Sequence, residues 1–315
     1  MATLSDMINE VSINLSGYTL QQDRATHITA DVAATASTIA APITLSLAST
    51  DSVGKGIVEI DEELFWVDNY DRVGNTATIA PYGRAYLGTT LAAHTAGTKV
   101  TIAPTFPRFV IKRAINDTIS AIGSSIFAAN TTTITSNSAV SAFRLPTTGA
   151  TLNISKILAI AYQALGSSKE WIPIRNYRFD GNANSTAFTS EQTISIYDMI
   201  TSGRTIQVVY STDPSVFPEL ATTALTNAQV FETVSGLPGS CKDLVILGAT
   251  YRLLSNLDPA RASMVSPQAD ETDSKRPYGS SQSLTRQIYA LYTQRLAEEV
   301  KSQQNKYPIR VHYSL

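Results

Sequence analysis

The chain has 315 residues, of which 43% are hydrophobic and only 16% are charged, and its formal net charge is −2. A chain of this length and apolar content can bury a core in about two domains, which excludes disorder as its default state. The balance of 24 basic and 26 acidic residues excludes a strongly basic nucleic-acid-binding protein, and a single cysteine excludes an intrachain disulfide. Acidic residues predominate in the first 100 residues and basic residues after residue 270. The two regions could pair between subunits or with a partner, and unpatterned surface charge explains the separation equally well.

The first half of the chain alternates between helical and strand patterns. Apolar residues at helical spacing predict a helix over residues 4–15, and the sequence Thr3–Asp6 resembles a capping box at its start. Residues 42–105 contain about five short strand patterns, typical of a small barrel or sandwich. A stripe of isoleucines after Pro107 then predicts a second helix, through Ile126.

The second half repeats this alternation. Short strands with turn signals over residues 131–212 predict an antiparallel sandwich, in which Pro173 marks an edge or irregular strand. Residues 157–162 are apolar throughout, so they fit either a strand or a buried helix. Apolar stripes over 244–254 and 284–296 predict two further helices, and an alternating tail follows Pro308.

These patterns predict an α+β fold. Each amphipathic helix must bury one face, so we expect helices distant in sequence to gather into one bundle, interrupted by a small β-module and a β-sandwich insertion. The expected segments are an N-terminal helix and linker (1–41), the β-module (42–105), a bundle helix (106–130), the sandwich (131–215), C-terminal bundle helices (216–306) and an extended tail (307–315).

The histidines and acidic residues give weak chemical signals. The three histidines fall in no metal-ligand spacing, and His94 lies in a turn-like loop where a structural hydrogen-bonding role is favoured over catalysis. The consecutive carboxylates Asp61–Glu62–Glu63 alternate in direction along a strand, so we expect a solvated hairpin turn and not an acid–base pair. Cys241, near a predicted helix start, has no partner in sequence and is expected to be inert.

One segment partly matches a calcium-loop template. Asp180, Asn182, Asn184 and Glu191 stand at positions 1, 3, 5 and 12 of that template, but Ser185 replaces the expected glycine. The flanking patterns are strands, so an ordinary turn is favoured over a calcium site. We therefore expect no metal, no cofactor and no catalytic residue. No apolar run approaches the roughly 20 residues of a membrane span, and the first residues lack a signal-peptide pattern, so we also expect no membrane partner.

Two stretches resemble virion proteins of tailed bacteriophages. Residues 60–67 (IDEELFWV) and 82–100 (YGRAYLGTTLAAHTAGTKV) resemble a small β-module built from an acidic hairpin, an R-G-x-x-G-T-T segment and an A-A-H-x-x-G loop, although Ala85 stands where that motif has glycine. Residues 236–240 (GLPGS) and 243–254 (DLVILGATYRLL) resemble a helix of phage head-to-tail connector, or adaptor, proteins.

The adaptor resemblance implies a structural role without catalysis. It implies a homo-oligomeric ring, commonly of twelve subunits, in the neck of the virion, assembled in the host cytoplasm. The ring would dock beneath the portal protein, contact head-closure or tail proteins, and let DNA pass through its lumen during ejection without sequence-specific binding.

The tail is the expected partner-binding segment. Its apolar residues share one face of an extended strand that can add to a sheet edge of the portal or of a neighbouring subunit. The expected contact residues are Tyr307, Ile309, Arg310, Val311, Tyr313 and Leu315. The alternative that the tail folds back on its own sandwich stays open.

Two other functions are compatible with the sequence. A tail or baseplate protein could bind a receptor glycan through the sandwich, and aromatic residues on an exposed sandwich face would favour it. A hydrolase without a recognisable motif is disfavoured, because no Ser/His/Asp arrangement is present in the sequence.

Overall fold

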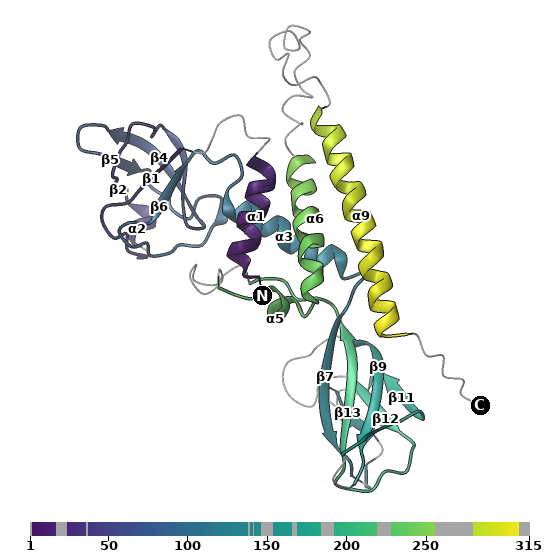
Figure 1. Cartoon of the computed structure of the whole chain (residues 1–315). Helices are drawn as coiled ribbons and strands as arrows, with labels where there is room; N and C mark the ends of the chain where they lie inside the picture. Colours follow the sequence, from purple (N-terminus) through teal and green to yellow (C-terminus); the bar gives the residue numbers. More distant parts are fainter. Residues whose placement is uncertain are drawn as a thin grey trace. The chain divides into compact units, whose positions relative to one another are not determined.

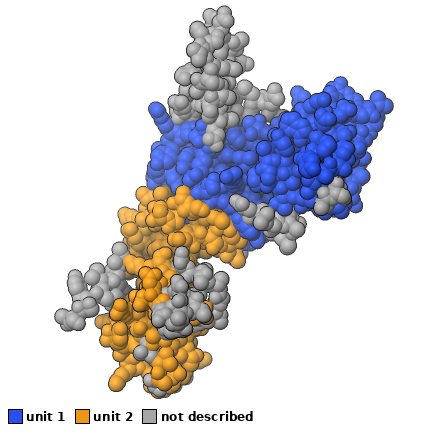
Figure 2. All heavy atoms as spheres, turned by 180° about the vertical axis from the view of Figure 1, so that it is seen from behind, with its two compact units in different colours: residues 1–118, 217–231, 239–294 blue, residues 119–216, 232–238, 295–315 orange. Residues whose placement is uncertain are grey.

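The computed structural model describes residues 2–16, 24–35, 37–137, 139–140, 142–145, 154–165, 169–183, 192–218, 228–255 and 280–308. The chain divides into two compact units (Figure 2). The first comprises residues 1–118, 217–231 and 239–294, and the second comprises residues 119–216, 232–238 and 295–315. Helices α3 (Arg108–Ile122) and α9 (Ser280–Lys306) each contribute to both units.

Six short strands of the first unit, most of them labelled in Figure 1, form an antiparallel sheet. Their order in the sheet is β1-β6-β3-β4-β5-β2. They are β1 (Arg24–His27), β2 (Ile43–Ser46), β3 (Gly56–Ile60), β4 (Glu63–Asp71), β5 (Thr76–Ile79) and β6 (Lys99–Ile102). Just beyond the two edge strands, Ile28 pairs with Leu47, and the amide of Ala48 donates to the carbonyl of His27 at 2.9 Å. The sheet therefore closes into a barrel, and strand β1 comes from the segment expected to be a linker.

The barrel core follows the two-residue period of its strands. Alternate residues point inward, so one strand contributes Val58 and Ile60 and the next contributes Phe65 and Val67. These side chains and their counterparts on the other strands form one buried apolar cluster. The predicted small β-module is thus observed, with six strands instead of about five.

The helical part of the first unit contains α1 (Leu4–Ser16) and α6 (Lys242–Ser255), which pack against each other. The predicted capping box is present: the Asp6 amide donates to the Thr3 hydroxyl at 3.2 Å, and the Thr3 amide donates to the Asp6 carboxylate at 3.0 Å. Helix α1 buries Leu4, Met7, Ile8, Val11 and Leu15, which share one helical face. The short helices are α2 (Ser37–Ala40), η1 (Tyr86–Gly88), α5 (Phe231–Ser235) and η2 (Gly239–Cys241).

The second unit contains two antiparallel sheets, in the orders β10-β9-β13-β7 and β11-β12-β8. Their strands are β7 (Ala128–Thr135), β8 (Ala142–Arg144), β9 (Ile154–Gln163), β10 (Trp171–Pro173), β11 (Tyr177–Asp180), β12 (Thr193–Ile196) and β13 (Thr205–Thr212). Residues of both sheets share one buried apolar cluster, so the sheets form a sandwich. Residues 157–162, which fitted either a strand or a buried helix, belong to strand β9. Pro173 lies on the edge strand β10, as predicted.

The C-terminal end of α9 belongs to the second unit. The Gln303 side-chain amide accepts from the Phe127 amide at 3.2 Å and donates to the Phe127 carbonyl at 2.6 Å. The ring of Tyr307 lies against the ring of Phe127, with centroids 5.9 Å apart. Tyr307, the first residue of the expected tail, therefore has a partner within its own chain.

The predicted helical bundle is wrong. The described residues form thirteen strands in three antiparallel sheets, but only four helices of seven or more residues. The helices occur where the periodicity predicted them, yet the barrel and sandwich clusters consist of strand residues and their flanks. On α9, Tyr292 is the one buried residue of the expected apolar stripe, whereas Leu291 is 52% exposed.

Candidate functional site

The densest group of buried charged side chains lies on the β3–β4 hairpin of the barrel. Ile60 pairs with Glu63, so Asp61 and Glu62 form a two-residue turn. Asp61 adopts a positive φ of 55°, a conformation that aspartate tolerates better than most residues. This hairpin presents carboxylates to two different sides, because Asp61 and Glu63 face His94 whereas Glu62 faces Lys112.

Glu63 is the centre of the cluster on the first side. Its side chain is fully buried and receives the guanidinium group of Arg84 in a bidentate ion pair, with Nε–Oε1 at 3.0 Å and Nη2–Oε2 at 2.9 Å. The amides of Ala85 and Ala92 donate to the same carboxylate at 3.1 and 3.0 Å. Burial raises the pKa of Glu63, but hydrogen bonds from His94, Arg84 and the Ala92 amide outweigh burial and lower it overall.

Arg84 spreads the contacts of this cluster to the neighbouring loops. Its Nη1 donates to the carbonyl of Ala33, and its Nη2 donates to the carbonyl of Ala92 at 2.6 Å. The guanidinium also stacks over the ring of Phe65, 5.1 Å from the centroid. One buried side chain thus ties together loop segments that come before and after the hairpin.

His94, in the loop between η1 and β6, is the fourth residue of the cluster. Its Nδ1 lies 2.8 Å from Asp61 Oδ2 and its Nε2 lies 2.9 Å from Glu63 Oε2, so carboxylates face both ring nitrogens. This arrangement favours the doubly protonated imidazolium. Burial lowers the pKa of His94, but the hydrogen bonds to Asp61 and Glu63 outweigh burial and raise it above its ordinary value of 6.5.

The other side of the hairpin holds helix α3. Glu59 accepts from the backbone amide of Arg108, the first residue of α3, and thereby caps the helix start. One turn later, Lys112 donates to Glu62 Oε2 at 3.2 Å, and both side chains are buried. Glu62 Oε1 is buried without a hydrogen-bond partner among the described residues.

The expectation of a solvated acidic turn is therefore wrong for two of its three carboxylates. The predicted alternation is observed, because Asp61 and Glu63 face His94 whereas Glu62 faces Lys112. Glu62 and Glu63 are nevertheless buried, since cations from distant parts of the chain compensate their desolvation. His94 has the structural hydrogen-bonding role that the sequence favoured.

The remaining predicted residues are only partly described. Asp180 accepts from the Asn182 amide at 3.0 Å, which is the ordinary turn contact, while Asn184 and Glu191 lie outside the described residues. Cys241 is buried at the start of α6. Of the expected partner-binding residues only Tyr307 is described, and Ile309, Arg310, Val311, Tyr313 and Leu315 lie outside the described part.

No protein-family model matches the chain, and no curated protein matches its sequence. Among the helices that the structure describes, none has the length and apolar character needed to cross a membrane.

Proposed function

We propose that the protein is a structural component of a tailed-phage virion, an adaptor subunit whose homo-oligomeric ring docks beneath the portal and forms part of the DNA conduit. The observation that carries the proposal is the cluster of buried Glu63, Arg84 and His94 with the partly exposed Asp61. These four residues all lie in the two stretches that resemble the virion β-module, which also contain Glu62 and Lys99. Their contacts connect two loops to the β3–β4 hairpin, and such rigid connections are expected of a structural protein.

The geometry of the cluster supports a mechanical role. Glu63 accepts from Arg84, His94 and two backbone amides, so its lone pairs are engaged within the chain. The same hairpin anchors α3 through Glu59 and Glu62. A barrel fixed in this way to a helix can transmit force between neighbours in an assembly.

In the stretch that resembles the adaptor helix, the glycine at position 236 is required for steric reasons. Gly236 has a positive φ of 69°, and a Cβ atom there would lie 2.7 Å from the Cβ of Ala128. Leu237 next to it is buried. The Gly-Leu-Pro-Gly segment before α6 therefore needs its first glycine for both backbone conformation and space.

Co-expression with the portal protein of the same phage tests the proposal. We expect the two proteins to copurify, and electron microscopy to show a ring of this chain against one face of the portal. Particles with the chain bound only to tail fibres or baseplate, or binding of glycans by the isolated chain, would instead support the receptor-binding function.

A truncation tests the role of the tail. Deleting residues 308–315 leaves the contact between Tyr307 and Phe127 intact, so we expect the truncated chain to stay folded and soluble. If the tail is the anchor, the truncated chain no longer joins the portal. A double variant of Ile309→Asp and Val311→Asp in the full chain serves as the matched control for chain length and is expected to give the same loss.

A further inference from the structure

Strand β7 gives the sandwich one long edge that no described strand covers. Its eight residues, Ala128–Thr135, pair with β13 on one side, and among the described residues no strand pairs with the opposite side (Figure 1). The amide of Ser136, the next residue, donates to the carbonyl of Arg204 on the β13 side at 2.7 Å. Because antiparallel hydrogen bonds alternate along a strand, the amides of Thr133 and Thr135 then point away from β13, toward the open edge.

The other edge strands of the sandwich carry features that discourage strand addition, but β7 carries none of them. Strand β10 has three residues and ends in Pro173, β8 has three residues and ends in Arg144, and β11 has four residues and contains Arg178. Short length, proline and charge are devices by which proteins protect sheet edges. Strand β7 is longer, has the sequence AANTTTIT without proline or charge, and pairs with β13 without a register shift. It is therefore the edge of the sandwich best suited to accept an added strand.

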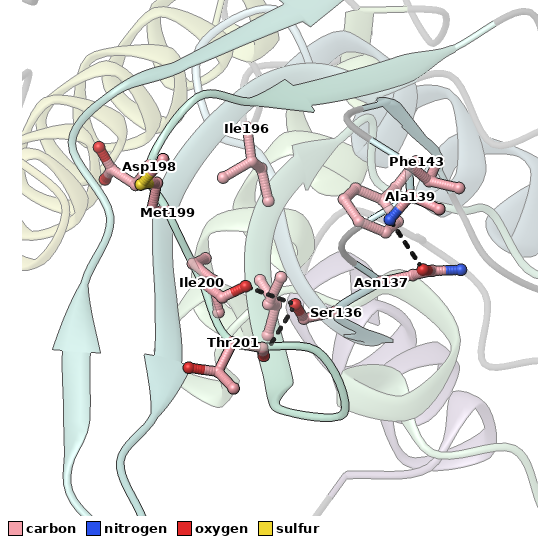
Figure 3. Close-up of a pocket in the computed structure, with 11 residues that line it drawn as sticks. Ser136, Asn137, Ala139, Phe143, Ile196, Asp198, Met199, Ile200 and Thr201 are labelled. Atoms are coloured by element: carbon pink, nitrogen blue, oxygen red, sulfur yellow. Dashed lines mark hydrogen bonds between the residues drawn. The ribbon is translucent and has the colours of Figure 1, made fainter.

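A cavity between the two sheets borders the same edge. It has a volume of about 570 Å³ and is lined by Ser136, directly after β7, and by Phe143 of β8, the edge strand of the other sheet (Figure 3). Polar groups of the lining are already hydrogen-bonded within the chain. The Ser136 hydroxyl donates to the Thr201 carbonyl at 3.2 Å, and the Asp198 carboxylate accepts from the Arg175 amide at 3.3 Å. What the cavity can take from a partner is therefore an apolar side chain.

Apolar side chains of this lining stay in contact with solvent. Val140 is 43% exposed and Met199 is fully exposed. A strand added to β7 directs alternate side chains toward the space between the sheets, because side chains at paired positions of neighbouring strands point the same way. An added strand with one apolar face would therefore cover the apolar lining while its backbone pairs with the edge.

The C-terminal segment 309–315, which lies outside the described residues, has the required pattern in its sequence. Apolar and polar residues alternate in it, in the order Ile309, Arg310, Val311, His312, Tyr313, Ser314 and Leu315. Seven extended residues span about 23 Å, and the eight residues of β7 span about 26 Å. We propose that segment 309–315 of one copy adds to the open edge of β7 of a second copy, antiparallel to it and with its apolar face toward the cavity.

The contact at the start of the tail favours a second copy over the tail's own chain. The ring of Tyr307 lies against the ring of Phe127, the residue that precedes β7, with centroids 5.9 Å apart. A tail that begins there can follow its own β7 only in the parallel direction, because seven extended residues leave none for a return. Every described strand pair of the sandwich is antiparallel, and antiparallel pairing is slightly more stable per residue. Only a tail from another copy is free to pair in this way.

The inference rests on the proposed function, because a ring requires a contact between two different surfaces of identical subunits. The tail and the β7 edge are two such surfaces. The tails then close the ring that docks against the portal, so deleting the tail weakens the contact between copies and the contact with the portal together.

Site-directed cross-linking tests the contact between copies. Cys241 is buried and is the only cysteine, so introduced cysteines react against a low background. Chains carrying Thr133→Cys are mixed with differently tagged chains carrying His312→Cys, alone at high concentration and in complex with the portal, and then oxidised. The matched control replaces Thr133→Cys with Arg178→Cys, on the edge strand β11 of the same sandwich. We expect roughly tenfold more covalent heterodimer than in the control, since a paired strand holds the two thiols at high effective concentration.

Two companion measurements complete this test. Thr131→Cys and Thr135→Cys repeat the mixture at neighbouring registers, and yields equal to the control at all three positions of β7 would overturn the proposal. A single chain that carries both Thr133→Cys and His312→Cys reports folding back. A disulfide formed within the monomer in dilute solution would show that the tail pairs with its own chain, and the contact between copies would be wrong.

Proline variants separate strand addition from folding. Thr133→Pro removes an amide that points to the open edge, so the ladder to β13 stays intact while an incoming strand loses a donor and meets the proline ring. Thr132→Pro is the matched control, because Thr132 pairs with Val208 and its amide points toward β13. We expect Thr133→Pro to lower the thermal midpoint less than Thr132→Pro does, and to abolish association between chains in sedimentation velocity with and without the portal. Equal losses of thermal midpoint would show that β7 presents other amides to its edge, and association unchanged by Thr133→Pro would contradict strand addition.

The two proposals fail in different ways. If the chain forms a ring on the portal but no cysteine of β7 cross-links to His312→Cys there, the strand addition is wrong and the adaptor function stands. If the cross-link forms but the chain never binds the portal, the contact between copies stands and the adaptor function is wrong.

Discussion

Arg84 and Glu63 form a bidentate ion pair in which both side chains are completely buried, with donor–acceptor distances of 3.0 and 2.9 Å. The two residues are 21 positions apart in the chain, so the pair fastens the loop after β5 to the β3–β4 hairpin. Removing one member of such a pair leaves an uncompensated charge in the interior.

We therefore expect Glu63→Gln to destabilise the protein by about 3–5 kcal/mol, the cost typical of breaking a buried ion pair. Glutamine keeps the size of the side chain, so the loss reports charge and hydrogen bonding and not a cavity. The free energy of unfolding from urea titration measures it. Asp68→Asn is the matched control, because the Lys55–Asp68 pair is 3.7 Å apart with side chains 69% and 64% exposed, and little change is expected there. Similar losses for both variants would contradict a special role for the buried pair.

The stability of the protein should depend on pH through His94. Because its folded pKa is raised above 6.5, the stabilisation from its charged form is fully present below that pH and is lost as the pH rises through the folded pKa. Glu63 acts in the opposite direction: its pKa is lowered below 4.5, so its stabilisation is present above that pH and is lost as the pH falls through the folded value.

The expected result is a plateau of stability between these limits and a decline on the alkaline side of pH 6.5. Urea unfolding at a series of pH values measures the decline. His94→Gln keeps hydrogen-bonding capacity without a titratable proton, so its unfolding free energy should lack the alkaline decline. If both proteins lose stability in parallel, other groups cause the pH dependence.

A third prediction concerns the contact between the hairpin and α3. Lys112→Met removes the cation that compensates the buried Glu62 carboxylate, and we expect a loss of about 3–5 kcal/mol. Adding Glu62→Met should recover at least half of the loss, because an apolar pair has no charge to desolvate. Chemical denaturation of the single and double variants measures this coupling. Additive losses in the double variant would show that the ion pair is not the relevant interaction.

The sequence predicted the elements of this fold better than their assembly. The helical spacing of Leu4 to Leu15 and the alternation in β3 and β4 are local patterns, and both are observed. The bundle was an inference from amphipathicity about which faces meet. That choice depends on contacts between distant segments, and the structure buries much of its apolar surface in the barrel and sandwich instead.

The burial of Glu62 and Glu63 shows the same limit in the candidate site. A run of three acidic residues is usually solvated, and nothing local distinguishes this one. Their partners Lys112 and Arg84 lie 50 and 21 positions away, and only the fold brings them within hydrogen-bonding distance. His94 was predictable as a loop-locking residue, whereas the identity of its two carboxylate partners was not.

The last prediction concerns a close contact among helices of the first unit. Gly248 on α6 faces Thr118 of α3 and Tyr292 of α9, and a Cβ atom there would lie 2.3 Å from Thr118 Cγ2 and 3.0 Å from Tyr292 Cε2. Gly248→Ala would normally stabilise a helix by about 1 kcal/mol, but here the overlap must displace a neighbour, and overpacking typically costs about 1–3 kcal/mol. We expect a net loss of stability, measured by thermal and urea unfolding.

Gly54→Ala, where no atom lies within 4 Å of the added Cβ, should be close to neutral. Thr118→Ser removes the methyl group that the new Cβ would strike and keeps the hydroxyl, which donates to the Ala114 carbonyl at 2.7 Å. Combining it with Gly248→Ala should therefore restore part of the lost stability, and a double variant no more stable than Gly248→Ala alone would show that Thr118 is not the group in conflict.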